Sequence, residues 1–237
     1  MRVASRGGGR ARVSQIGAWV TVIGLAVIGL WDASALDRPV EHLFGNAHGF
    51  VWKENWYLAH VLHDQAKKLS WLVLLGLVLM IRWPLGGLRR LSVRERGEMV
   101  VAIVLAVLTV SLLKQLSATS CPWSLKEFGG VRDYISHWDW QLREPGGGQC
   151  FPAGHATSGF AFMAGWFWLR DASPRLATHW LAVALLAGGL LGAAQQVRGA
   201  HFTSHTLWSA WICWTVSWLF WEACRRLDRS AREVAAG

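Results

Sequence analysis

The sequence predicts an all-α, polytopic membrane protein, a six-helix transmembrane bundle with loops on its outer face. Hydrophobic residues make up 53% of the chain and charged residues only 16%, whereas soluble globular domains carry about 25% charged residues. The chain has 17 Trp residues, and Trp is enriched where membrane helices meet water. Six apolar stretches recur along the 237 residues, and this length suits a single domain, 1–237.

The apolar stretches are interpreted as membrane helices because they lack a polar face. A surface helix of a soluble protein shows polar residues at a spacing of about 3.6, and the run 72–81, LVLLGLVLMI, shows none. Several runs are shorter than the roughly 20 residues that cross a bilayer, but small or amphipathic neighbours extend them. The six stretches are 16–31, 69–83, 99–113, 160–169, 176–194 and 202–224.

The first stretch has a second interpretation as a secretory signal peptide. It follows a basic, Gly-rich N-terminus, and small residues at 33–35 would suit a cleavage site. We expect an uncleaved span, because five more apolar segments follow and six spans make an even number.

The basic residues indicate the orientation of the helices. If the N-terminus lies in the cytoplasm, 15 of the 24 Lys and Arg residues fall in four cytoplasmic segments, as the positive-inside rule predicts. The net charge of +9 then reflects topology and contact with anionic lipid headgroups, not nucleic-acid binding. The four segments are 82–98, 170–176 and the basic tails 1–15 and 225–237.

Two outer segments are long. Residues 32–61 mix aromatic and polar side chains, as does an amphipathic segment lying along the membrane surface. Residues 117–152 contain Pro122 and the run Pro-Gly-Gly-Gly at 145–148, which favours a loop.

Three sets of polar residues lie at outer ends of the predicted spans, where ionisable side chains are candidates for function. Each alone has a plainer interpretation: a Lys at a helix end often reaches for the interface, and a His pair at i, i+4 often only packs. Their convergence on one side of the bilayer favours a shared site. The sets are Lys114, the run Phe151-Pro152-Ala153-Gly154-His155, and the segment 198–205.

The spacing within these sets resembles that of the type-2 phosphatidic acid phosphatase family, which are integral membrane lipid phosphatases. That family carries Lys-x6-Arg-Pro, Pro-Ser-Gly-His and Ser-Arg-x5-His-x3-Asp. The resemblance covers about residues 95–220, including the order of the helices. The corresponding residues here are Lys114-x6-Cys121-Pro122, Pro152-Ala153-Gly154-His155 and Ala194-Gln195-x5-His201-x3-His205.

Several motif positions depart from the family pattern. Cys121 stands at an Arg position, Ala153 at a Ser position and His205 at the Asp position. The pair Ala194-Gln195 replaces Ser-Arg, so two phosphate-binding Arg residues are missing at their usual places.

Other residues are candidates for the missing roles. Arg198 lies one turn nearer to His201, and Arg132 lies in the outer loop. The family's Asp would hold the imidazole of the attacking histidine. Here His205 stands at that position, and it could hold the imidazole of His201 only as a neutral ring that accepts a hydrogen bond.

The resemblance implies phosphohistidine chemistry without a metal or other cofactor. His201 would attack phosphorus, and His155 would protonate the departing oxygen and then activate water. Histidine suits both roles because its usual pKa of about 6.5 is near working pH. The phosphate would be bound by cationic side chains and by N–H groups at a helix start: Lys114, Arg198, Arg132, Ala153 and Gly154.

A zinc site is the alternative chemistry. His201 and His205 have metal-ligand spacing, and His155 would be a third ligand. No Glu accompanies the pair as in His-Glu-x2-His, and the order of the motifs favours phosphohistidine chemistry.

Two of the four cysteines are candidates for a disulfide. Cys121 and Cys150 lie in one outer loop, and a periplasm is oxidising, so we expect a bond between them beside the site, against the alternative of two free thiols. Cys213 and Cys224 lie in the last stretch, where a small apolar role is the default.

The expected activity is hydrolysis of a phosphate or diphosphate on a membrane lipid. The family implies undecaprenyl diphosphate, lipid A, phosphatidic acid or phosphatidylglycerophosphate as substrate, and a bacterial inner membrane with the site facing the periplasm. Two alternatives remain open: a phosphotransferase that passes the same phosphoryl group to a lipid alcohol, and a catalytically weak lipid-binding protein.

Overall fold

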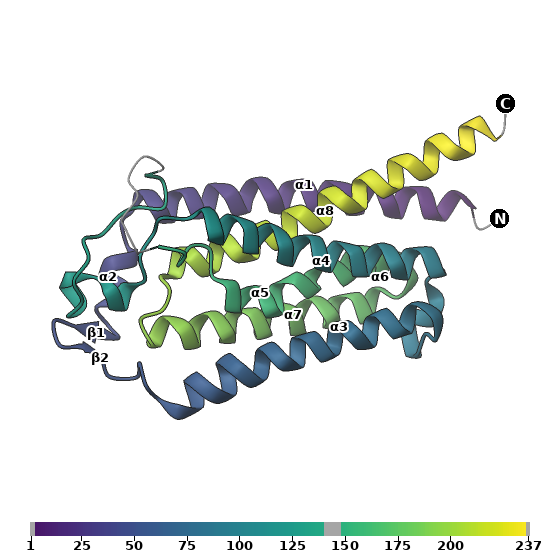
Figure 1. The fold of residues 1–237 in the computed structure, drawn as a ribbon. Helices are drawn as coiled ribbons and strands as arrows, with labels where there is room; N and C mark the ends of the chain where they lie inside the picture. Colours follow the sequence, from purple (N-terminus) through teal and green to yellow (C-terminus); the bar gives the residue numbers. More distant parts are fainter. Residues whose placement is uncertain (1–2, 140–147, 236–237) are drawn as a thin grey trace.

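The computed structural model describes residues 3–139 and 148–235, so part of the predicted Gly-rich loop, 145–147, lies outside the described residues. Long helices lie side by side and short elements gather at one end of them (Figure 1). The long helices and their continuations are α1 (Val3–Ala33), η1 (Tyr57–Gln65), α3 (Ala66–Arg82), α4 (Val93–Leu116), α5 (Gly154–Phe160), η5 (Ala161–Met163), α6 (Ala164–Ala172), α7 (Pro174–Val197) and α8 (Thr203–Val234). The short elements are α2 (Asp37–Glu41), β1 (Gly45–Asn46), β2 (Gly49–Phe50), η2 (Gly86–Arg90), η3 (Pro122–Ser124) and η4 (Lys126–Phe128).

The predicted all-α class is confirmed, and a two-stranded antiparallel hairpin, β1–β2, is added to it. Within the described residues, four helical segments are long and apolar enough to cross a membrane: Arg12–Ala33, Tyr57–Arg90, Val93–Leu116 and Pro174–Val197. The fourth predicted span is divided between the short helices α5 and α6, and the sixth lies within α8. Six crossings therefore stay a prediction.

The ends of the bundle differ as the charge pattern predicts. Both described chain ends and the α3–α4 and α6–α7 connections lie at one end, and the hairpin and the loop after α4 lie at the other (Figure 1). The four segments expected on one side of the membrane thus share one end of the bundle. We call the opposite end the loop end.

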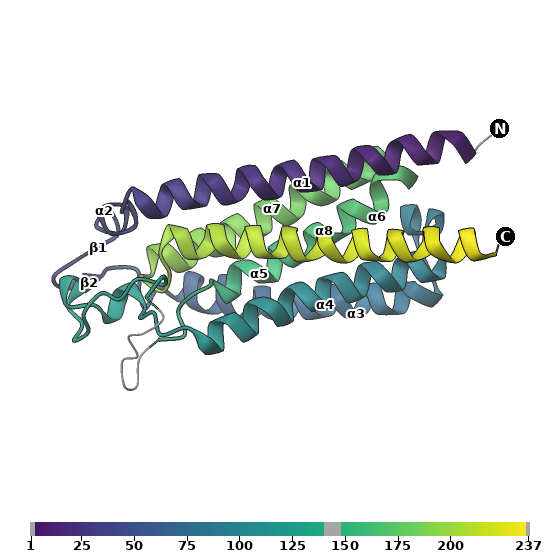
Figure 2. The ribbon, with the colours of Figure 1, turned by 90° about the horizontal axis from the view of Figure 1, so that it is seen from above.

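Helix α8 lies at the centre of the bundle, between α1 and α4 (Figure 2). Two indole N–H groups of α8 donate to main-chain carbonyls of α1: Trp211 to Thr21 at 2.8 Å and Trp214 to Gly17 at 3.3 Å. These two Trp residues thus contribute to helix packing, a role that composition did not suggest.

The start of α8 is fixed by a buried carboxylate from α2. Asp37 accepts hydrogen bonds from the amide of Ser204, at 3.0 Å, and from its hydroxyl. Trp31 of α1 donates to the same carboxylate at 2.8 Å. An acidic side chain at a helix N-terminus complements the helix dipole, so these contacts hold the segment before α8 in place.

Helices α5 and α7 approach closely because glycines face each other. A Cβ added at Gly159 would lie only 2.6 Å from Cα of Gly188. A larger residue at either position would push the two helices apart. This close packing fixes the position of α5 beneath the loop end.

A buried carboxyl group in α2 leads to a prediction about stability. Glu41 is 0% exposed, and burial raises its pKa to about 9, with nearby Asp37 adding to the increase. A Glu in the unfolded chain ionises near pH 4.3, so the folded protein loses stability as pH rises from there towards 9. We expect Glu41→Gln to stabilise the protein by roughly 3 kcal/mol at pH 7.

Thermal unfolding of detergent-solubilised protein between pH 5 and pH 9 would measure this effect. The stability gap between Glu41→Gln and the parent protein should widen with pH, and the exposed Glu54→Gln variant should show no such widening. A gap that stays constant with pH would contradict a buried, protonated Glu41.

Candidate active site

Three histidines from two motifs meet at the loop end. His155 lies in the first turn of α5, His201 precedes α8, and His205 lies in its first turn. The ring centroids of His155 and His201 are 6.3 Å apart, and those of His201 and His205 are 5.8 Å apart. The structure therefore brings together the three residues predicted to carry the chemistry.

Hydrogen bonds to α8 hold the start of α5 in register with it. The Ala153 amide donates to the His205 carbonyl at 3.2 Å, and the Ser209 hydroxyl donates to the Ala153 carbonyl at 3.0 Å. These bonds position His155 opposite His201. They also occupy the Ala153 amide, so a phosphate would have to compete with the His205 carbonyl for the donor that sequence reasoning assigned to it.

The orientation of His201 comes from the main chain. Its Nδ1–H donates to the carbonyl oxygen of Cys150 at 2.7 Å, and the side chain is buried. This bond leaves the lone pair of a neutral ring on Nε2, the nitrogen available for attack. The expected partner, His205, instead meets the His201 ring edge-on, and its own Nδ1 has no hydrogen-bond partner among the described residues.

The surroundings of His201 keep it neutral. Burial lowers its pKa well below the usual value, and the positive charge of Lys114 lowers it further, with His205 and His155 contributing. A neutral imidazole is the nucleophilic form, so the environment supports the role that the motif predicts.

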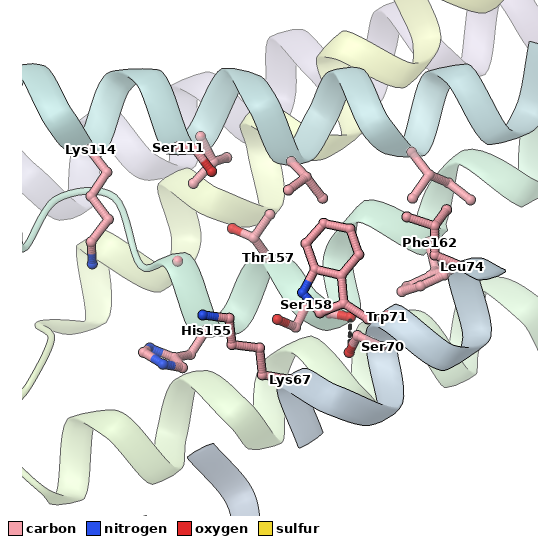
Figure 3. A pocket seen from close by; sticks show the side chains of 14 residues that line it. Lys67, Ser70, Trp71, Leu74, Ser111, Lys114, His155, Thr157, Ser158 and Phe162 are labelled. Atoms are coloured by element: carbon pink, nitrogen blue, oxygen red, sulfur yellow. Dashed lines mark hydrogen bonds between the residues drawn. The ribbon is translucent and has the colours of Figure 1, made fainter. Parts of the chain in front are cut away.

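A cavity of about 330 Å³ opens beside His155, between α3, α4 and α5 (Figure 3). Lys114 and His155 line one part of it, and apolar side chains line the rest, including those of Trp71, Leu74 and Phe162. The cavity thus combines a cationic part with an apolar part in one space.

Lys67, in the first turn of α3, is a cavity residue that the motifs did not reveal. In Figure 3 its side chain extends towards His155. It precedes the second predicted span, 69–83, and lies outside the region that resembles the family. The available signal was a Lys-Lys pair at 67–68, just before an uninterrupted apolar run.

The two Arg candidates lie as follows. The Arg198 Nε donates to the Lys53 carbonyl at 3.0 Å, and its Nη1 donates to Oε1 of Gln195 at 3.2 Å. Those bonds leave three of its five N–H groups, one on Nη1 and two on Nη2, as donors for a phosphate. Arg132 pairs through its backbone with Leu125.

Gln195, at the position of the missing motif Arg, is a further candidate phosphate donor. It is 1% exposed, and its Nε2 has no hydrogen-bond partner among the described residues. An unpaired buried amide is costly, and a bound phosphate oxygen would satisfy it.

The predicted disulfide is present in the structure. Cys121 and Cys150 are bonded, with their Cα atoms 5.2 Å apart. Cys213 and Cys224 are free and buried in α8. The bond fastens the segment after α4 to the residue whose carbonyl orients His201.

The alternative, a zinc site, would need several metal-binding side chains close together. Among the side chains that the structure describes, no group of three or more His, Cys, Asp or Glu residues is arranged to hold a metal ion.

The family model described as PAP2 superfamily matches residues 97–229, a region that contains all three motif sets. No curated protein and no solved structure matches the chain with significance.

Proposed function

The chain belongs to the PAP2 superfamily, and from this premise we propose that it hydrolyses a phosphate or diphosphate on a membrane lipid through a phosphohistidine on His201. The superfamily indicates phosphatase activity, typically on lipid phosphates. The lipid class and the histidine intermediate are the parts that we add.

The cavity carries the proposal. One part offers Lys114, Lys67 and His155, and the rest is apolar. Ligand pockets commonly combine apolar walls with a few polar groups that fix orientation. Because α3 and α4 belong to segments apolar enough to cross a membrane, a lipid tail would reach this cavity from the bilayer while its phosphate meets the cations. Undecaprenyl diphosphate, lipid A, phosphatidic acid and phosphatidylglycerophosphate all have this form.

The first chemical step would be attack of His201 Nε2 on phosphorus. The Cys150 carbonyl accepts the Nδ1–H bond and would stabilise the positive charge that grows on the ring. The lysines would neutralise the phosphate oxygens, and such positioning and charge neutralisation supply most of the catalysis in phosphoryl transfer.

The second histidine would handle the protons. His155 faces His201 across 6.3 Å between ring centroids, a gap that a phosphoryl group would fill. As general acid it would protonate the leaving oxygen, and as general base it would then deprotonate the water that cleaves the phosphohistidine.

The location that we propose is a bacterial inner membrane, with six spans and the loop end in the periplasm. The basic segments gather at the end of the bundle opposite the loop end (Figure 1), which supports this orientation under the positive-inside rule. A disulfide at the loop end suits an oxidising compartment.

The test is inorganic phosphate release by purified protein from a panel of lipid phosphates, with EDTA present. Release under these conditions supports a metal-independent hydrolase. Transfer of label to a lipid alcohol without phosphate release would indicate the phosphotransferase alternative, and binding without either reaction would indicate the lipid-binding one.

Replacement of Lys67 should weaken catalysis if it helps to bind the phosphate. A hydrogen bond to a charged group contributes about 1.5–3 kcal/mol, so we expect Lys67→Met to lower kcat/KM roughly tenfold or more. Lys68→Met is the matched control, because Lys68 is its exposed neighbour and does not line the cavity. Equal activity of the two variants would remove Lys67 from the phosphate site.

A further inference from the structure

The attacking histidine is oriented by a residue that is also half of a disulfide. His201 donates from Nδ1 to the Cys150 carbonyl at 2.7 Å, and Cys150 is bonded to Cys121. The family motif places a carboxylate where this chain has His205, and His205 makes no Nδ1 hydrogen bond within the described part of the chain. The main-chain carbonyl therefore occupies the role that a side-chain carboxylate would otherwise fill.

The disulfide closes a ring of contacts around His201. On one side, the Trp123 amide donates to the Gly199 carbonyl at 2.9 Å, which ties the segment after Cys121 to the loop two residues before His201. On the other side, Cys150 reaches His201 directly. The covalent bond joins these two sides, so the position of the carbonyl relative to the imidazole depends on it.

Backbone contacts alone hold Cys150 less firmly. Its amide donates to the Thr119 carbonyl at 3.1 Å, and the Gln149 amide donates to Ser117 at 2.9 Å. Both bonds lead to the short segment that leaves α4, which has no regular structure at 117–121. They would keep residues 149–150 nearby after reduction without fixing the direction of the Cys150 carbonyl.

We propose that the Cys150 carbonyl, held in place by the Cys121–Cys150 disulfide, is the positioning group of His201, so that turnover depends on the redox state of this bond. The proposal rests on the proposed phosphohistidine function. The oxidised form keeps the Nδ1–H tautomer with Nε2 aimed at phosphorus, and the reduced form lets the ring turn or change tautomer. A small displacement of a reacting group can cost about 10²-fold in rate.

The principal experiment compares oxidised and reduced wild-type protein in detergent. TCEP and water convert the disulfide to two thiols: phosphorus takes the oxygen, and each sulfur gains one hydrogen. We expect kcat to fall about 10- to 100-fold with KM nearly unchanged, and to recover when TCEP is replaced by glutathione disulfide. Full kcat in protein shown by mass to be reduced, or a change in KM alone, would overturn the proposal.

Matched variants locate the effect. Cys121→Ser and the double variant Cys121→Ser/Cys150→Ser should have the same kcat as reduced wild-type protein. Their kcat should not change when TCEP is added. Cys213→Ala/Cys224→Ala should keep the TCEP response, because those thiols are free and lie in α8. A TCEP response that persists without Cys121, or disappears without Cys213 and Cys224, would contradict the assignment.

A second measurement does not require the reduced protein to stay folded. The ¹⁵N shifts of His201 in the oxidised protein, assigned by their loss in His201→Gln, should show a neutral ring protonated at Nδ1. Protonation at Nε2 would overturn the positioning role. Because this readout needs no turnover, it separates the proposal from the proposed function, which would fail if oxidised protein released no phosphate from any lipid.

Discussion

The His201→Gln variant should release no phosphate and form no phosphoenzyme. Removing a nucleophile removes the covalent path, and for an enzyme with a covalent nucleophile we expect a loss in kcat on the order of 10⁴-fold or more. Gln is chosen because its amide can still donate towards the Cys150 carbonyl, so the buried position keeps a polar partner. The measurement is phosphate release together with acid-quench trapping of labelled lipid phosphate and peptide mapping.

The control for this experiment is His179→Gln, which changes an exposed histidine of α7 and should keep wild-type activity. Thermal unfolding of both variants would show that His201→Gln is folded. If label appears on no histidine of the wild-type protein and EDTA abolishes activity, the phosphohistidine mechanism is wrong and the metal alternative returns.

The His155→Ala variant should lose about 10²–10⁴-fold in activity on lipid phosphates, the usual contribution of general acid–base catalysis. The loss should depend on the leaving group. A nitrophenolate departs without protonation, so a nitrophenyl phosphate ester should restore the first half-reaction in His155→Ala and restore nothing in His201→Gln. The measurement is the burst of nitrophenolate in single-turnover kinetics.

Phosphoenzyme should then accumulate on His201 of the His155→Ala variant, because His155 is also needed to activate water. Equal losses on both substrates would show that His155 is not the general acid. A burst followed by normal turnover would show that another group activates the water.

The helical class and the shared site were predictable because both depend on local patterns. Uninterrupted apolar runs favour membrane helices, and the spacing from Lys114 to His155 and His201 indicated one chemistry before any contact was known. The pairing of Cys121 with Cys150 also followed, because both lie in one outer loop. The number of membrane crossings was harder to predict from the sequence. The helices α5 and α6 are largely buried, and each is shorter than the roughly 20 residues that cross a bilayer.

The details of the site depend on contacts between distant segments. Lys67 reaches the cavity only because α3 packs beside α5, where the Ser70 hydroxyl donates to the Ser158 carbonyl at 3.0 Å. Arg198 is directed to Lys53 by the position of the segment after β2. Neither outcome is visible in the spacing of motif residues.

By itself, the sequence determined the helical, membrane-like class and the family, and it picked out the three candidate histidines, because composition and spacing along the chain carry that information. Only the tertiary structure decided what orients His201. Sequence reasoning looked for a side chain and chose His205, yet the acceptor is the Cys150 carbonyl. Every residue carries such a carbonyl, so no pattern of residue types can distinguish the one that the fold brings within hydrogen-bonding distance.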